Sequence, residues 1–240
     1  MRKVIVASIA LIFAGIAAAA DASEATLKAA FEKKFPNIPV ESVVKTPLAG
    51  IYEIYANGQI VYADEKASFL FVNGSLIDTE RKADLTEERM SKLTAIKFED
   101  LPLSLAFKKV KGKGTRKFAY FGDPNCGYCK KFEENLTKLN DVTIYVFLYP
   151  VLGPDSIEKA KSIWCSKDRA KAWDDQLVRG VAPTAPATCD TSTIDKTLAF
   201  GRDKKISGTP TIFFADGQRV PGMMPLEIME QRLAAATPSR

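Results

Sequence analysis

Residues 118–139 read FAYFGDPNCGYCKKFEENLTKL, and this stretch decides the fold of the chain. It begins with apolar and aromatic residues, passes through the helix breakers Gly122 to Asn125, and ends in apolar residues at helical spacing. The pattern predicts a strand that turns sharply into a helix, with Cys126 at the helix N-terminus. There the unpaired backbone N–H groups and the positive end of the helix dipole favour a thiolate over a thiol.

Cys126 and Cys129 belong to the motif Cys-Gly-Tyr-Cys, whose spacing suits redox chemistry. A thiolate is the nucleophile of disulfide exchange, and helix N-termini lower cysteine pKa values to roughly 3.5–7.5. Cys129 follows one helical turn later, close enough to attack a mixed disulfide formed at Cys126. A zinc site is a poorer explanation, because it needs two more ligands and the chain has no histidine and no second close cysteine pair. A structural disulfide across one turn would close almost no loop. We therefore predict a redox pair without a metal or other cofactor.

The start of the chain is typical of a secretory signal peptide. Two basic residues follow Met1, then comes an apolar run from Val4 to Ala17, and three alanines precede Asp21. The pattern predicts a peptide that is cleaved after residue 20; the alternative is an uncleaved anchor. Cleavage would remove two positive charges and no negative ones from a chain of net charge +5. The mature chain is then too weakly basic to indicate nucleic-acid binding.

Export changes what the other two cysteines are expected to do. Disulfides persist outside the cytoplasm, and an even number of cysteines favours complete pairing. If Cys126 and Cys129 are the redox pair, Cys165 and Cys189 are left for each other. Their bridge would close a loop of about two dozen residues and contribute roughly 3 kcal/mol in the chain-entropy model. The alternative is a pair of buried free thiols.

The mature chain is predicted to form two domains joined by a linker. Residues 21–83 combine an amphipathic helix over residues 24–34 with short strands, and Asn57-Gly58 and Asn73-Gly74 mark hairpins between them. This α+β domain has a marginal core and free sheet edges, which pairing with a second copy would complete. We therefore expect a homodimer formed through it. Residues 84–105 are predicted to be a linker helix, the alternative being a core helix of either domain.

Residues 106–240 are predicted to form an α/β domain. A nearly unbroken apolar run over residues 142–149 indicates a strand buried on both faces. Residues 155–203 are largely helical and form an insertion. The basic segment Lys108–Lys117 contains a Gly-x-Gly turn and matches no phosphate-binding loop, so we expect a solvated hairpin there.

The mature chain resembles the periplasmic DsbC/DsbG family of thiol–disulfide isomerases. The residues that carry the resemblance are LAGIYEI at 48–54, LTEER at 85–89, FGDPNC at 121–126, the Cys-Gly-Tyr-Cys motif, and Thr-Pro at 209–210 before a later strand. The resemblance implies a thioredoxin fold over residues 105–236. It also implies a V-shaped homodimer that is joined by the N-terminal domains, with both active sites facing an uncharged cleft.

The resemblance also implies a role for each site residue. Cys126 would be the attacking thiolate, and Cys129 the buried resolving thiol. Thr209 would precede a cis-proline, Pro210, packed beside the disulfide, and this loop would bind substrate together with Gly127 and Tyr128. The Gly-Tyr pair between the cysteines is closer to DsbC than to DsbG.

The expected function is that of a periplasmic isomerase that rearranges non-native disulfides in exported proteins. A membrane thiol reductase of the DsbD type would keep it reduced, as the resemblance implies. One alternative is a DsbG-like reductase of sulfenylated cysteines. Another is a DsbA-like oxidase, although such enzymes lack this N-terminal domain. The third is a holdase chaperone for unfolded exported proteins, in which the cysteines are secondary.

Overall fold

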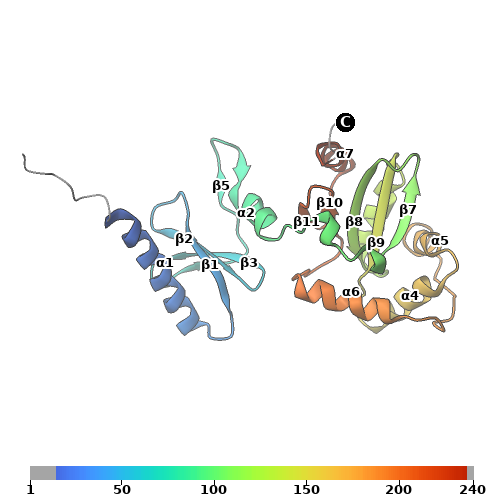
Figure 1. Ribbon diagram of the computed structural model, residues 1–240, viewed down its shortest axis with the longest axis horizontal. Helices are drawn as coiled ribbons and strands as arrows, with labels where there is room; N and C mark the ends of the chain where they lie inside the picture. Colours follow the sequence, from blue (N-terminus) through green and yellow to red (C-terminus); the bar gives the residue numbers. More distant parts are fainter. Residues whose placement is uncertain (1–14, 237–240) are drawn as a thin grey trace, which may run out of the picture. The chain divides into compact units, whose positions relative to one another are not determined.

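The computed structural model describes residues 15–236 of the chain (Figure 1). Most of the predicted signal peptide, residues 1–20, lies outside the described residues. The chain divides after Met90 into two compact units, each with its own hydrophobic core. In the described part of the chain, no helix is both long enough and apolar enough to span a bilayer.

The first unit packs one helix against a four-stranded antiparallel sheet. Its elements are α1 (Gly15–Lys34), β1 (Val40–Lys45), β2 (Ile51–Ala56), β3 (Gln59–Asp64) and β4 (Leu70–Phe71), and the strands lie side by side in sequence order. Leu27 and Phe31, one turn apart on α1, are buried in one cluster with Ile54. Asn57 and Gly58 have φ values of 49° and 79°, as a two-residue hairpin turn requires. The hairpin prediction at this position is confirmed.

The second predicted hairpin, at Asn73-Gly74, is wrong. Strand β4 pairs with β3, whereas β5 (Ile77–Asp78) pairs with β6 (Ala83–Asp84). The Asp78 carboxylate accepts a hydrogen bond of 3.1 Å from the backbone N–H of Glu80 and so closes the turn between these two strands. The chain therefore reverses after Asp78, where no Asn-Gly pair marks the turn.

Helix α2 (Leu85–Leu93) is anchored to the sheet of the first unit. The Asp84 carboxylate caps it by accepting the N–H of Glu87 at 2.9 Å. Farther along α2, Arg89 donates a hydrogen bond of 2.9 Å to the buried carboxylate of Glu53 on β2. The helix therefore begins where the sequence predicts, and side chains of the first unit hold it.

The helix is shorter than the predicted span of residues 84–105. After Leu93 the chain forms only two short 3₁₀ turns, Phe98–Asp100 and Leu103–Leu105. Phe98 and Leu101 are buried in the core of the second unit. The helix therefore does not continue through residues 94–105, where the chain instead places Phe98 and Leu101 in the core of the second unit.

The second unit is built on a five-stranded mixed sheet with the strand order β11-β10-β8-β9-β7 (Figure 1). Its elements are β7 (Phe107–Lys111), β8 (Arg116–Gly122), α3 (Gly127–Leu136), β9 (Val142–Leu148), α4 (Pro154–Cys165), α5 (Arg169–Asp174), a π-helical turn (Asp175–Arg179), α6 (Ser192–Asp203), β10 (Thr211–Phe214), β11 (Arg219–Pro221) and α7 (Leu226–Ala235). Strands β8 and β9 are parallel, and the other neighbouring strands are antiparallel. The predicted α/β fold is confirmed.

Strand β8 is central and buried on both faces. Phe118 and Tyr120 belong to the core that includes residues of α3, α5 and α7. Ala119 and Phe121 belong to the core on the opposite face, where the first 3₁₀ turn and α6 pack. Phe121 stacks on Phe147 of β9 with 4.4 Å between the ring centroids. This packing fixes the end of β8, from which the chain runs into the Cys126 loop.

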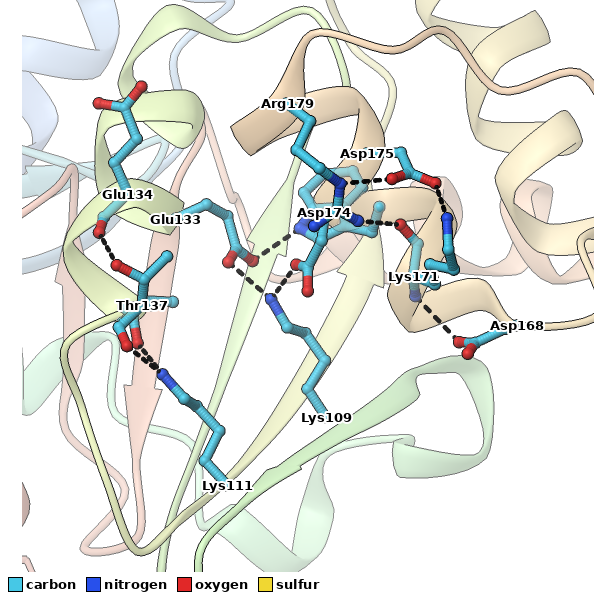
Figure 2. Close-up of polar contacts among 12 residues, drawn as sticks. Lys109, Lys111, Glu133, Glu134, Thr137, Asp168, Lys171, Asp174, Asp175 and Arg179 are labelled. Carbon is cyan, nitrogen blue, oxygen red and sulfur yellow. Dashed lines mark hydrogen bonds and ion pairs between the residues drawn. The ribbon is translucent and has the colours of Figure 1, made fainter.

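The predicted solvated hairpin over Lys108–Lys117 is wrong. Strand β9 lies between β7 and β8, so that Lys109 lies opposite Ile144 of β9. The turn itself is present, because Gly112 has a φ of 56° and a Cβ there would lie 2.4 Å from the Asp141 carboxylate. The Lys109 side chain is only 11% exposed, and its ammonium pairs with the buried carboxylate of Glu133 and the partly exposed carboxylate of Asp174 (Figure 2). The turn at Gly112 thus connects β7 and β8, which do not pair with each other because each pairs with β9.

Candidate active site

Cys126 is the N-cap residue of α3. Its sulfur accepts a hydrogen bond from the backbone N–H of Cys129 at 3.3 Å. In the thiol form, it donates to the backbone carbonyl of Thr209 at 3.2 Å. The loop of residues 122–125 supplies the sharp turn that the sequence predicts before the helix. Cys126 therefore lies between the start of α3 and the loop before β10.

These contacts lower the pKa of Cys126 from 9.0 to about 6. The largest cause is the hydrogen bond from the Cys129 thiol. Burial opposes it, and hydrogen bonds from the Thr209 side chain and from the N–H groups of Cys129 and Tyr128 add to it. At neutral pH the Cys126 side chain is therefore largely a thiolate. A sulfur in this state is prepared for nucleophilic attack on a disulfide.

Cys129 has the opposite electrostatic environment. Its side chain is completely buried, and burial raises its pKa far above the ordinary value, with the hydrogen bond to Cys126 and the charge of Cys126 adding to the rise. Cys129 therefore stays protonated while Cys126 is ionised. The two thiols, three residues apart, are chemically distinct because one caps the helix and the other points into the core.

The loop before β10 lies beside the cysteines. The Thr209–Pro210 peptide bond is cis, Thr209 is half-buried, and Pro210 is buried. Thr211, which follows, pairs in register with Phe121 of β8. The loop is therefore held at the same end of the sheet as the Cys126 loop.

Gly127 and Tyr128 lie on the open side of the motif. A Cβ added to Gly127 would have no neighbour within 4 Å. The Tyr128 side chain is 64% exposed, and the Lys131 ammonium lies 5.8 Å from its ring centroid. Both residues are thus accessible to a protein that approaches Cys126.

Cys165 and Cys189 are joined by a disulfide with a Cα–Cα distance of 5.6 Å. The bridge ties the end of α4 to the segment before α6. The Ser162 hydroxyl reinforces this link by donating to the Ala185 carbonyl at 2.7 Å. The proline-containing stretch of residues 180–191 is thereby fixed against α4.

Asp123, which lies in the FGDPNC stretch, organises the site through its buried carboxylate. Its carboxylate is completely buried and accepts hydrogen bonds from the N–H groups of Val151 and Leu152 at 2.8 and 3.0 Å. It also accepts from the Ser156 hydroxyl and the Asn125 N–H, at 2.8 and 2.7 Å. In the sequence, the position of Asp123 between Gly122 and Pro124 indicates only a turn.

The loop held by Asp123 presents two apolar side chains to solvent. Val151 is 43% exposed and Leu152 is 58% exposed. Asp123 attaches this loop to the turn that leads into Cys126, and its own carbonyl accepts the Cys126 N–H at 3.1 Å. The sequence offers no signal for these two residues, because apolar residues after a buried strand usually continue into the core.

The described residues contain no group of three or more cysteine, aspartate or glutamate side chains placed to hold a metal ion.

Comparisons with known proteins place the chain in a family. Residues 18–87 match the model of the disulfide bond isomerase protein N-terminal domain, and residues 103–237 match that of the thioredoxin-like domain. The probable thiol:disulfide interchange protein DsbC of Bordetella pertussis is 44% identical over 217 residues, which are 90% of this chain and 76% of the relative. The chain belongs to the DsbC family of thiol:disulfide interchange proteins. It is a thiol–disulfide oxidoreductase.

Two further comparisons extend over different parts of the chain. The thiol:disulfide interchange protein DsbC of Escherichia coli K12 is 29% identical over 230 residues, which are 92% of this chain and 90% of the relative. The crystal structure of a disulfide interchange protein from Neisseria gonorrhoeae superimposes with a TM-score of 0.55 at 36% identity. That structure covers 58% of this chain and is itself covered completely.

The pKa of Cys126 should depend on Cys129. In the wild-type protein, the thiolate absorbance near 240 nm should titrate with a midpoint at about pH 6. Cys129→Ala removes the largest stabilising contact, so the midpoint should rise toward 9, the ordinary value. Cys126→Ala is the control, because the buried Cys129 should not titrate in this range. A wild-type midpoint near 9, or an unchanged midpoint in Cys129→Ala, would contradict this account.

Proposed function

We propose that this DsbC-family protein is a periplasmic disulfide isomerase that acts through Cys126 and Cys129. The observation that carries the proposal is the pairing of a low-pKa Cys126 with a fully buried, protonated Cys129 at the start of α3. The printed names of the curated relatives support the same class of reaction. Pairing between Cys165 and Cys189 leaves the first two cysteines available for catalysis.

The proposed reaction begins with attack of the Cys126 thiolate on a non-native disulfide of an exported protein. A bond forms between Cys126 and one client sulfur, and the other client sulfur leaves as a thiolate. That thiolate attacks elsewhere in the client, and the rearrangement finally releases Cys126 as a thiolate. When rearrangement stalls, Cys129 displaces the client, and the enzyme is left oxidised. A membrane thiol reductase of the DsbD type would then return the pair to the dithiol.

We place the client beside the exposed residues around Cys126. Tyr128, Val151 and Leu152 offer apolar surface, which matches the exposed apolar side chains of a misfolded chain. The Thr209-Pro210 loop would contact the client backbone next to the reacting disulfide. Backbone contacts and general apolar contacts do not depend on client sequence, so one site could serve many clients.

Two cysteine variants test the assignment. Cys126→Ala should abolish both the reduction of a model disulfide and the reactivation of a scrambled multi-disulfide protein. Cys129→Ala should keep the first attack but accumulate mixed disulfides, visible as high-mass bands on non-reducing gels. Equal loss in both variants without trapped clients would contradict the roles. A chaperone would instead be favoured if the wild type showed no disulfide exchange and the double variant Cys126→Ala/Cys129→Ala still prevented aggregation of an unfolded protein as well as the wild type does.

We also propose that the protein is a homodimer joined through the β4 edge of the first unit. Strand β4 is the last strand of its sheet, and an edge strand offers unpaired backbone groups to a second copy. Phe69 and Phe71 on this edge are 74% and 62% exposed, and Val72 and Ile77 beyond it are 55% and 50% exposed. A patch of this composition is typical of a protein interface.

The double variant Phe69→Glu/Phe71→Glu should separate the dimer into monomers in analytical ultracentrifugation. Each buried phenylalanine would contribute about 1.5–3 kcal/mol, and the introduced charges would repel their copies across the interface. Leu48→Glu is the matched control, because Leu48 is 55% exposed in the same unit but lies outside this edge. A dimer that survives the double variant would place the interface elsewhere.

A further inference from the structure

Asn125, the residue before Cys126, is exposed, but its side chain is held by polar contacts to one helix. Its amide nitrogen donates to the Asp155 carboxylate at 2.7 Å and to the Ser156 hydroxyl at 3.0 Å. Its amide oxygen accepts a hydrogen bond of 2.8 Å from the Lys159 ammonium. All three partners lie in the first two turns of α4. We call these four side chains the Asn125 clamp, because they fasten the turn before Cys126 to the start of α4.

The charges on either side of Asn125 allow only one orientation of its amide. The Lys159 ammonium can only donate a hydrogen bond, and an ionised Asp155 carboxylate can only accept one. These two groups also pair with each other at 2.8 Å. The pKa of Asp155 is held below its ordinary value, first by the hydrogen bond from Lys159 and then by the one from Asn125. The Asn125 side chain is therefore fixed in one position although it is exposed.

Ser156 joins the clamp to the buried carboxylate of Asp123. Ser156 is completely buried, its oxygen accepts from Asn125, and its hydroxyl donates to Asp123 at 2.8 Å. From another element, the side-chain amide of Gln176 on the π-helical turn donates a hydrogen bond of 3.0 Å to the Pro124 carbonyl. Each residue of the turn from Asp123 to Asn125 is thus held by a hydrogen bond from a neighbouring helix.

The turn that the clamp holds leads directly into Cys126. Asn125 is bonded to Cys126 through the peptide link, and the Cys126 N–H donates to the Asp123 carbonyl at 3.1 Å. The Cys126 sulfur owes part of its low pKa to the N–H of Cys129, 3.3 Å away. Hydrogen bonds weaken steeply when the distance or the angle becomes unfavourable. A small movement of the turn would therefore take the sulfur away from the groups that stabilise its charge.

We propose that Asn125 is a positioning residue for thiol–disulfide exchange, which holds the Cys126 sulfur at the N-terminus of α3 by clamping the preceding turn to α4. The proposal rests on the proposed function, in which Cys126 makes the first attack. Asn125 acts through the backbone of Cys126 and transfers neither protons nor electrons. The same position also favours Cys126 as a leaving group when another thiolate displaces it, because a thiol of lower pKa leaves faster.

Position and charge make opposite predictions for Asp155. If this carboxylate acted on Cys126 through its charge, its removal would lower the pKa of Cys126, because a nearby negative charge disfavours a thiolate. If it acts by fixing Asn125, its removal should raise the pKa of Cys126. The direction of the shift in Asp155→Ala therefore separates a positioning role from a direct electrostatic one.

Titration of the reduced full-length protein, followed by the ultraviolet absorbance of the thiolate, measures this shift. The wild-type midpoint should lie at about pH 6. Asn125→Ala and Asp155→Ala should each raise it by about one pH unit, which is a roughly tenfold weaker preference for the thiolate. Asp155→Asn keeps an acceptor for the Asn125 amide and should raise it less. The double variant Asn125→Ala/Asp155→Ala should shift it no further than Asn125→Ala does, because both residues act through one contact.

Glu158→Ala is the matched control on the same helix. Glu158 is 69% exposed and pairs with Lys161 at 3.2 Å, much as Asp155 is 70% exposed and pairs with Lys159. The partner of Glu158 lies on α4 itself, not on the turn before Cys126, so Glu158→Ala should leave the midpoint unchanged. Thermal unfolding of the same variants, followed by circular dichroism, reports their stability separately.

An unchanged midpoint in Asn125→Ala, whatever the stability of that variant, would overturn the proposal, since Asn125 would then be merely structural. A lower midpoint in Asp155→Ala would also overturn it, because charge alone would then act on the sulfur. So would a double variant whose shift is the sum of the two single shifts, or a rise in Glu158→Ala as large as that in Asp155→Ala. A wild-type midpoint near 9 would instead refute the proposed role of Cys126, and the positioning role with it.

Discussion

The sulfur of Cys126 lies at the N-terminus of α3, where the first backbone N–H groups have no partner within the helix. A negative charge at this position is stabilised by those N–H groups and by the helix dipole. The N–H of Cys129 reaches the sulfur at 3.3 Å, and the Cys129 thiol adds the strongest single contact. The other parts of the site serve to hold this sulfur in place. The end of β8 is held by its packing and leads into the turn of residues 122–125. The Asp123 carboxylate fixes this turn against the loop after β9.

The contrast between Cys126 and Cys129 has a consequence for the stability of the reduced protein. The pKa of Cys126 is about 6 in the folded chain and 9.0 for an ordinary thiol. Because the folded value is the lower one, ionisation of Cys126 stabilises the folded, reduced protein. This contribution is complete above about pH 9 and is lost as the pH falls through about 6. The dithiol is thereby favoured over the disulfide at neutral pH, and the proposed isomerase cycle begins with this dithiol.

Local patterns in the sequence were enough to predict the elements on which the active site depends. The breakers before Cys126 predicted its N-cap position, and the alternation around Asn57-Gly58 predicted the first hairpin. The sequence did not reveal pairings between distant residues. The turn at Gly112 looks like a hairpin because nothing nearby shows that β9, some thirty residues later, lies between the two strands. Lys109 and Glu133 likewise look like solvated charges, because each is buried only through contacts with other elements. Asp123 is a turn residue in the sequence, and three of its four partners, Val151, Leu152 and Ser156, come from the chain after β9 and become visible only in the fold.

The central claim is that Cys126 and Cys129 act as a reduced, attacking pair while Cys165 and Cys189 stay bridged. The redox state of the four cysteines in living cells tests it most directly. Cells would be quenched with acid, their free thiols alkylated with a heavy maleimide, and the protein analysed by peptide mass mapping. The account predicts that Cys126 and Cys129 carry the label and that Cys165 and Cys189 do not, so that the second pair is an internal reference. A protein in which Cys126 and Cys129 are mostly joined to each other would contradict it, because such a pair would donate disulfides instead of rearranging them.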